Sequence, residues 1–197
     1  YDRDSIGIAC TKRTYFEEWA NQSGLNPEQR ANRYAADLLL PKSMFVPRAR
    51  NKPITLDSAS ELAATFGTSL TSTAIRLVEH GSYSAMIYCT KAQPGRPNSW
   101  RRRWFSRSPD LLDSLWPKDW PGPNTLASAL MKGDRAESSG PAEVPADEWL
   151  DHKNAANCTV IESSARIADD LILSILWWKD HRQLLALYDD DEDQLFE

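Results

Sequence analysis

The stretch Asn26-Pro-Glu-Gln-Arg-Ala-Asn-Arg-Tyr-Ala-Ala-Asp-Leu-Leu-Leu-Pro41 decides the fold of the first half of the chain. Asn26 is a favourable N-cap, Pro27 suits the first helical position, and Gln29 completes a capping box. Apolar residues then recur at helical spacing until Pro41 ends the run: Ala31, Tyr34, Ala35, Leu38 and Leu39. The pattern predicts one buried helix with a carboxylate near its start.

One stripe of this helix combines polar and very small residues. Glu28, Ala31, Asn32 and Ala35 fall on the same face at helical spacing. Small side chains let another element approach closely, as a carboxylate must when it completes a metal site held by a neighbouring helix. The stripe therefore places the Glu28 carboxylate, and the Asn32 amide one turn later, on a face that another element can approach closely.

The same residues resemble the signature of the ImmA/IrrE metallopeptidase family, Glu-x-x-Ala-Asn-x-Phe/Tyr-Ala-x-x-Leu-Leu-x-Pro, which follows a zinc-binding HExxH helix. The resemblance continues through residues 62–77. The matching positions in the signature are Glu28, Ala31, Asn32, Tyr34, Ala35, Leu38, Leu39 and Pro41. The resemblance implies that Glu28 is the third zinc ligand, that Asn32 is a hydrogen-bonding group beside it, and that this helix forms one wall of an active site.

The resemblance also implies an activity and a substrate. A member of this family would be a zinc endopeptidase that cuts a helix-turn-helix repressor in a stress, mobile-element or phage-defence response. Phe16 and Trp19 lie in the segment that would line the substrate cleft, together with Tyr34. Packing of Phe16 and Trp19 on the core is the alternative.

The chain departs from the family in one respect. It contains no HExxH, and its three histidines, His80, His152 and His181, are not one helical turn apart. Two such histidines and the adjacent glutamate bind zinc and activate its water. We expect that motif to lie before Tyr1, and the chain as it stands not to hydrolyse peptides by the family mechanism. The alternative is a catalytically inactive scaffold that binds a repressor or another partner.

Composition narrows the other function classes. The 197 residues carry a net charge of −5, which disfavours nucleic-acid binding by the chain as a whole. No apolar run approaches the roughly 18 residues of a membrane span. Three widely spaced cysteines are typical of reduced thiols, so we expect a cytoplasmic protein. Arg101, Arg102, Arg103 and Arg107 form a basic cluster and residues 189–197 an acidic tail, both interpreted as solvated surface.

Residues 57–80 predict a helix pair. Asp57 is placed to cap the first helix, Gly67 supplies the turn and Ser69 caps the second helix. This arrangement is also that of a helix-turn-helix, so a DNA-binding regulator with Arg76 as a contact is a further alternative. We expect instead that the pair completes a helical peptidase-like unit over residues 1–81.

Residues 82–188 are expected to form a small α+β domain, which makes the whole chain α+β. Strands are predicted at 83–90, 100–106, 158–164 and 171–178, and the last is apolar enough to be central. Short helices are predicted at 111–116 and 125–131, a basic loop before Pro53 and a polar loop at 132–146. Seven tryptophans of this unit are candidates for a ligand cavity, with plain core packing as the alternative: Trp100, Trp104, Trp116, Trp120, Trp149, Trp177 and Trp178.

Overall fold

The computed structural model describes residues 34–95, 99–112, 114–133 and 138–188. They form an α+β fold with helices in the N-terminal half and an antiparallel sheet in the C-terminal half, as the sequence predicts. Helical residues 34–39 are followed by α3 (Lys42–Ala49), α4 (Leu56–Phe66) and α5 (Leu70–His80). None of the described helices is both long and apolar enough to span a membrane.

The helices α4 and α5 begin and end at residues that favour helix termini. Ser69 accepts a hydrogen bond from the backbone N–H of Ser72, and Gly67 between the helices adopts φ 64°, a conformation that glycine tolerates best. Both features confirm the sequence prediction. The N-cap of α4 is Thr55, which accepts from the N–H of Ser58, whereas Asp57 lies in the first turn. The prediction of Asp57 as the cap was therefore wrong by two residues.

The sheet has five antiparallel strands in the order β2-β1-β5-β4-β3. Their bounds are β1 (Ala85–Ala92), β2 (Trp100–Arg107), β3 (Ser138–Pro145), β4 (Thr159–Ala168) and β5 (Leu171–Trp177). The apolar strand β5 is central, as predicted, and both of its faces are buried. Leu173 and Ile175 join one hydrophobic cluster, and Ile172 and Leu176 join the other.

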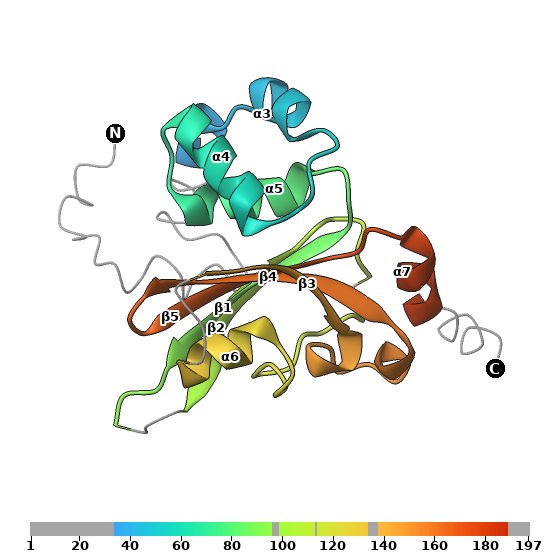
Figure 1. Ribbon diagram of the computed structural model, residues 1–197. Coiled ribbons are helices and arrows are strands. Elements are labelled where there is room, and N and C mark those ends of the chain that lie inside the picture. The colour runs from blue at the N-terminus through green and yellow to red at the C-terminus, as the bar shows by residue number, and fades with distance from the viewer. Residues whose placement is uncertain (1–33, 96–98, 113, 134–137, 189–197) are drawn as a thin grey trace, which may run out of the picture.

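Helices cover both faces of this sheet (Figure 1). On one face lie α3, α4 and α5, whose apolar residues share a single cluster with β1, β2 and β5. The opposite face is covered by α6 (Leu126–Lys132) and two short helices, η2 (Ala146–Glu148) and η3 (Ala155–Asn157). The C-terminal helix α7 (His181–Tyr188) packs Leu184 and Leu187 into this second cluster.

Two stretches are more regular than the sequence predicted. The helix α3 was not predicted and ends inside the basic loop before Pro53; it forms because Phe45 and Ala49, four residues apart, are both buried against α4 and α5. The polar loop predicted at 132–146 contains the edge strand β3. Pro141 and Pro145 are compatible with that strand because an edge strand leaves one row of its backbone groups unpaired.

Two predictions around β2 were also wrong. Strict alternation along 100–106 predicts that Trp100 and Trp104 share one face of the strand. A bulge opposite Cys89 and Thr90 instead turns Trp104 to the face opposite Trp100. The described residues of 111–116 form no helix. Arg107 of β2 binds two of their carbonyls instead, since its Nη1 donates to the carbonyl oxygens of Leu112 at 2.8 Å and Leu115 at 3.4 Å.

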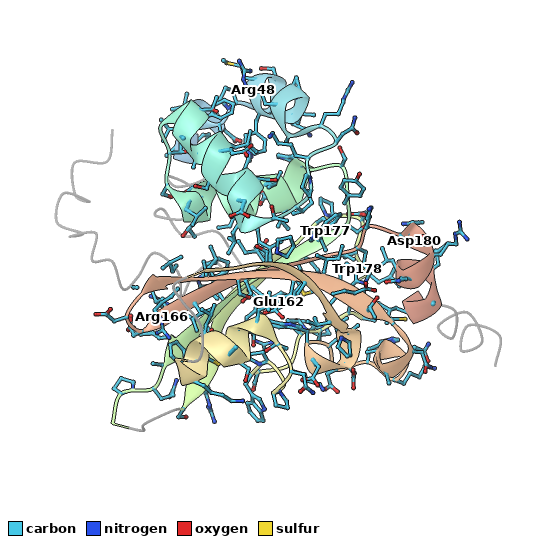
Figure 2. The ribbon with its side chains drawn as sticks, viewed as in Figure 1. Arg48, Glu162, Arg166, Trp177, Trp178 and Asp180 are labelled. Carbon is cyan, nitrogen blue, oxygen red and sulfur yellow. The ribbon has the colours of Figure 1, made fainter. Side chains whose placement is uncertain are left out.

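A buried carboxylate joins α6 to the sheet. Glu162 on β4 is 0% exposed and accepts hydrogen bonds from the backbone N–H groups of Leu126 (2.9 Å) and Ala127 (2.7 Å). It also accepts from the indole nitrogen of Trp149 (3.2 Å) and the hydroxyl of Ser164 (2.7 Å). Figure 2 places the side chain on the α6 side of the sheet. Each carboxylate oxygen thus accepts two donors, and the group acts as an anchor for the helix.

We predict that Glu162→Gln destabilises the fold by about 2–3 kcal/mol. In either orientation of the new amide, its NH₂ group faces a backbone N–H and leaves that donor without an acceptor. Urea denaturation measures the change in unfolding free energy. Glu61→Gln is the matched control, because this carboxylate is 68% exposed beside Lys52 and its loss should cost less than about 1 kcal/mol. Equal costs for the two variants would contradict the anchor role.

The cost of Glu162→Gln should also depend on pH. Burial raises the pKa of Glu162 above its ordinary value of 4.5, so the folded state binds a proton at this carboxyl group more tightly than the unfolded state. The stability that this tighter proton binding contributes is complete below pH 4.5 and falls as pH rises through the folded pKa. The free-energy difference between wild type and variant should therefore shrink as pH rises, measured by urea denaturation at a series of pH values. A free-energy difference that grows as pH rises would contradict the raised pKa of Glu162.

Candidate functional site

Most of the predicted zinc-site and cleft residues lie outside the described part of the chain. Glu28, Asn32, Phe16 and Trp19 all precede residue 34. Tyr34 is described and its side chain is 70% exposed. The zinc-ligand role of Glu28 and the cleft roles therefore stay predictions.

The described residues offer no alternative metal centre. Among them, no group of three or more His, Cys, Asp or Glu side chains is placed to hold a metal ion. Cys89 and Cys158 are buried free thiols in the two different hydrophobic clusters. Burial raises the pKa of the Cys89 thiol to about 12, so this sulfur is not a thiolate near neutral pH.

Arg76, the predicted DNA contact, points into the protein. Its residue is 8% exposed, and its guanidinium donates to the carbonyl oxygen of Leu40 at 3.2 Å and to Asp37 at 2.7 Å. A DNA reader needs its basic side chains on the exposed face of the second helix. The assignment of Arg76 to DNA is corrected on this ground: Arg76 joins α5 to helical residues 34–39.

The described residues of the helix ending before Pro41 are mostly exposed, so the prediction that this helix is buried is wrong for residues 34–39. Several of its large apolar side chains, and Met44 of the adjoining α3, are exposed. Leu38 is 81% exposed, Leu39 58% and Tyr34 70%, and Met44 is half exposed. These four residues are called the Leu38 face below. Large exposed apolar groups that adjoin one another are typical of surfaces that contact another element or protein.

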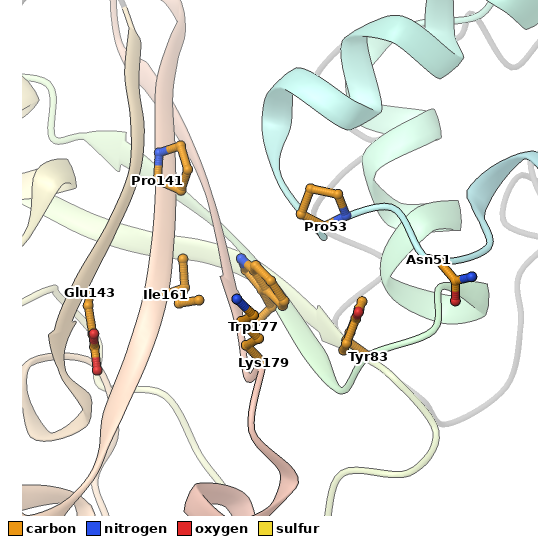
Figure 3. Close-up of a pocket in the computed structure, with 8 residues that line it drawn as sticks. All are labelled: Asn51, Pro53, Tyr83, Pro141, Glu143, Ile161, Trp177 and Lys179. Carbon is orange, nitrogen blue, oxygen red and sulfur yellow. The ribbon is translucent and has the colours of Figure 1, made fainter.

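A groove lies where the loop before α4 meets the sheet (Figure 3). Its cavity volume is about 470 Å³, within the range of small-molecule sites. Its walls are mostly apolar and come from Pro53, Tyr83, Pro141, Ile161 and Trp177. Its polar side chains are Asn51, Glu143 and Lys179.

Trp177 at the end of β5 forms the floor of the groove. Its position is fixed on both sides, since Ala85 of β1 and Ile161 of β4 are its cross-strand partners. The Tyr83 ring packs against it at 5.2 Å between centroids. Although the residue is only 5% exposed, its indole nitrogen has no hydrogen-bond partner among the described residues. In Figure 3 this nitrogen is turned toward the side on which Pro53 and Pro141 lie.

The two charged groups of the groove differ in how they are bound. Glu143 accepts a hydrogen bond from the hydroxyl of Thr159, which also lies 3.0 Å from the Gln183 amide oxygen. Lys179, two residues after Trp177, makes no ion pair or hydrogen bond within the described part of the chain. The groove thus presents one ammonium group that forms no ion pair with a described acidic group, including Glu143 of the same groove.

A second cavity continues the groove toward α7. It shares Glu143, Ile161, Trp177 and Lys179 with the first cavity and adds Arg182 from the start of α7. Arg182 lies 3.8 Å from Asp180. The continuous groove therefore contains a second cation, which an acidic neighbour partly neutralises.

The tryptophans do not build one cavity, contrary to the first of the two interpretations. Trp104 and Trp177 pack in the cluster under α4 and α5, whereas Trp149 and Trp178 pack in the cluster on the other face. Trp116 and Trp120 are exposed. Of the seven, Trp177 and Trp178 line the groove, and no sequence signal distinguished these two from the other five.

Comparison with protein-family models and with curated protein sequences finds no match for the chain.

We predict that Arg76→Met destabilises the fold by about 1–3 kcal/mol, because methionine keeps the buried stem but loses the bonds to Leu40 and Asp37. Thermal and urea unfolding measure the effect. Arg50→Met, at an exposed site, should change stability little. A change in affinity for duplex DNA without any change in stability would contradict the structural role.

Proposed function

We propose that this chain is the distal part of a zinc-dependent endopeptidase of the ImmA/IrrE type, which cleaves a helix-turn-helix repressor. The Glu28-to-Pro41 signature supports the proposal, together with the exposure of its large apolar members. In this account the described residues position and complete the catalytic unit and do not themselves perform the chemistry.

The Leu38 face is the structural observation that carries the proposal. Tyr34, Leu38 and Leu39 are signature positions, and all three expose most of their side chains. Leaving a leucine in water instead of burying it forgoes about 1.5–3 kcal/mol. A helix that forms one wall of an active site would bury this face against the element that carries the metal-binding histidines.

Zinc does not fit the described residues, because none of their ligand groups cluster in a way that would hold it. The proposed ligands are instead Glu28 and the histidines of an HExxH helix. Residues of this chain contribute in another way: Arg76 on α5 holds the end of the signature helix through Asp37 and the Leu40 carbonyl. That contact fixes how the helix is presented to a neighbouring element.

The second candidate is a catalytically inactive scaffold that binds a repressor or another partner. The same Leu38 face favours it, because an exposed apolar surface can equally dock a separate protein. The two candidates differ in what buries Leu38: a segment of the same polypeptide in the first, and a separate protein in the second.

The test uses the extended protein, meaning this chain together with the residues encoded before Tyr1. We expect an in-frame HExxH there, zinc bound in equimolar amount by elemental analysis, and loss of both zinc and repressor cleavage in Glu28→Gln. Glu61→Gln, whose carboxylate is exposed, is the control and should keep both. An extended protein without HExxH, or a Glu28→Gln variant that keeps its zinc, would exclude the peptidase assignment.

Leu38→Glu tests the burial of the Leu38 face separately. In the chain alone the variant should change the unfolding free energy by less than about 0.5 kcal/mol, because Leu38 is exposed. In the extended protein it should cost about 2–3 kcal/mol, since a charge would then enter a buried contact. An equally small cost in both proteins would favour the scaffold.

A further inference from the structure

We propose that the groove beside Trp177 binds an organic carboxylate with a flat apolar body, held by the Trp177 indole N–H and the Lys179 ammonium group. This site is independent of the proposed peptidase centre. It lies between the loop before α4 and the end of β5, and none of the predicted zinc or cleft residues lines it.

The Trp177 indole N–H is a donor that the described residues leave unused. A buried N–H without an acceptor costs about 1–3 kcal/mol, so most buried donors in folded proteins are bonded. Trp149 in the same fold follows this rule through Glu162. The Trp177 and Trp178 nitrogens do not, although both residues are almost fully buried. Of the two, Trp177 lines the first cavity beside Lys179. An acceptor atom supplied by a ligand would satisfy its indole N–H.

The Lys179 ammonium group adds a positive charge to this donor. Lys179 follows Trp177 by two residues and lines the same cavity without an anionic partner in the described part of the chain. One N–H donor and one ammonium group together suit a group with two acceptor oxygens and a negative charge. Glu143, the acid that lines this cavity, accepts a hydrogen bond from Thr159 and makes no ion pair with Lys179. The two groups of this cavity that the described residues leave without a partner, the indole N–H and the ammonium group, are both donors, so they favour an anion as the ligand.

The walls of the groove indicate the shape of the ligand body that carries the carboxylate. Pro53, Pro141 and Ile161 surround the Trp177 ring, and Tyr83 packs against it. Flat rings and proline faces favour a planar or compact apolar body. The volume of about 470 Å³ admits a ring with a short side chain.

Access to the indole nitrogen requires a small movement. The atom is out of contact with solvent, so a ligand reaches it only by displacing a groove side chain. Lys179 lies beside Trp177 in Figure 3, and its long side chain is the flexible part of the wall. A carboxylate that draws the ammonium group toward itself would open the way to the indole N–H.

The carboxylate can come from a free small acid or from the C-terminus of a peptide. Both offer the same two oxygens, and the continuation of the groove toward Arg182 leaves room for a longer ligand. The shared chemistry is the proposal, and probes of the two kinds distinguish the sources.

The experiment follows the indole N–H resonances of the ¹⁵N-labelled chain during titration. The probes are phenylacetate, its neutral analogue phenylacetamide, and Gly-Gly-Phe with a free or an amidated C-terminus. We expect phenylacetate to move the Trp177 resonance downfield in a saturable manner and to leave that of Trp149, already bonded to Glu162, unchanged. Trp177→Phe assigns the resonance, and tighter binding of the free tripeptide than of phenylacetate would identify a peptide terminus as the source.

Lys179→Gln keeps the proposal testable if the Trp177→Phe variant does not fold. It should weaken phenylacetate binding about tenfold, whereas Lys132→Gln, at an exposed cation on α6, should leave binding unchanged. The proposal is overturned if neither phenylacetate nor the free tripeptide moves the Trp177 resonance. It is overturned equally if phenylacetamide binds as tightly as phenylacetate, or if Lys179→Gln has no effect.

Discussion

The carboxylate of Glu162 is the constraint on which the lower layer of the structure depends. It is fully buried in a central part of the sheet, and water is replaced there by the first two N–H groups of α6, the Trp149 indole and the Ser164 hydroxyl. A helix of seven residues has little stability of its own. Its N-terminus is held by this carboxylate, whose four donors offset part of the cost of removing it from water.

The upper layer is held by a different kind of contact. Apolar side chains of α3, α4 and α5 share one cluster with the sheet, and α5 adds a buried charged residue, Arg76. Through Asp37 and the Leu40 carbonyl it joins α5 to the end of the signature helix. The groove opens where this layer stops covering the sheet, so the loop before α4 and the end of β5 can both line it.

Sequence patterns predicted elements whose determinants are local. Ser69 and Gly67 specify a cap and a turn by their own chemistry, and the apolar run of β5 specifies a central strand. Sequence patterns failed where contacts between residues far apart in the chain determine the local structure. Arg107 of β2 binds the carbonyls of Leu112 and Leu115, where the sequence predicted a helix. The strand β3 forms despite its prolines because it pairs with β4 along an edge. The groove could not be predicted, since its walls come from five separate parts of the chain.

The proposed function joins a sequence signature to an exposed surface. Leu38 and Leu39 are apolar at positions where a solvent-facing helix would carry polar residues, and the proposed peptidase gives that face a buried neighbour. Amide hydrogen exchange of residues 34–45, compared between the chain alone and the extended protein, tests this most directly. We expect much slower exchange in the extended protein. Identical exchange in the two proteins would contradict the proposed burial.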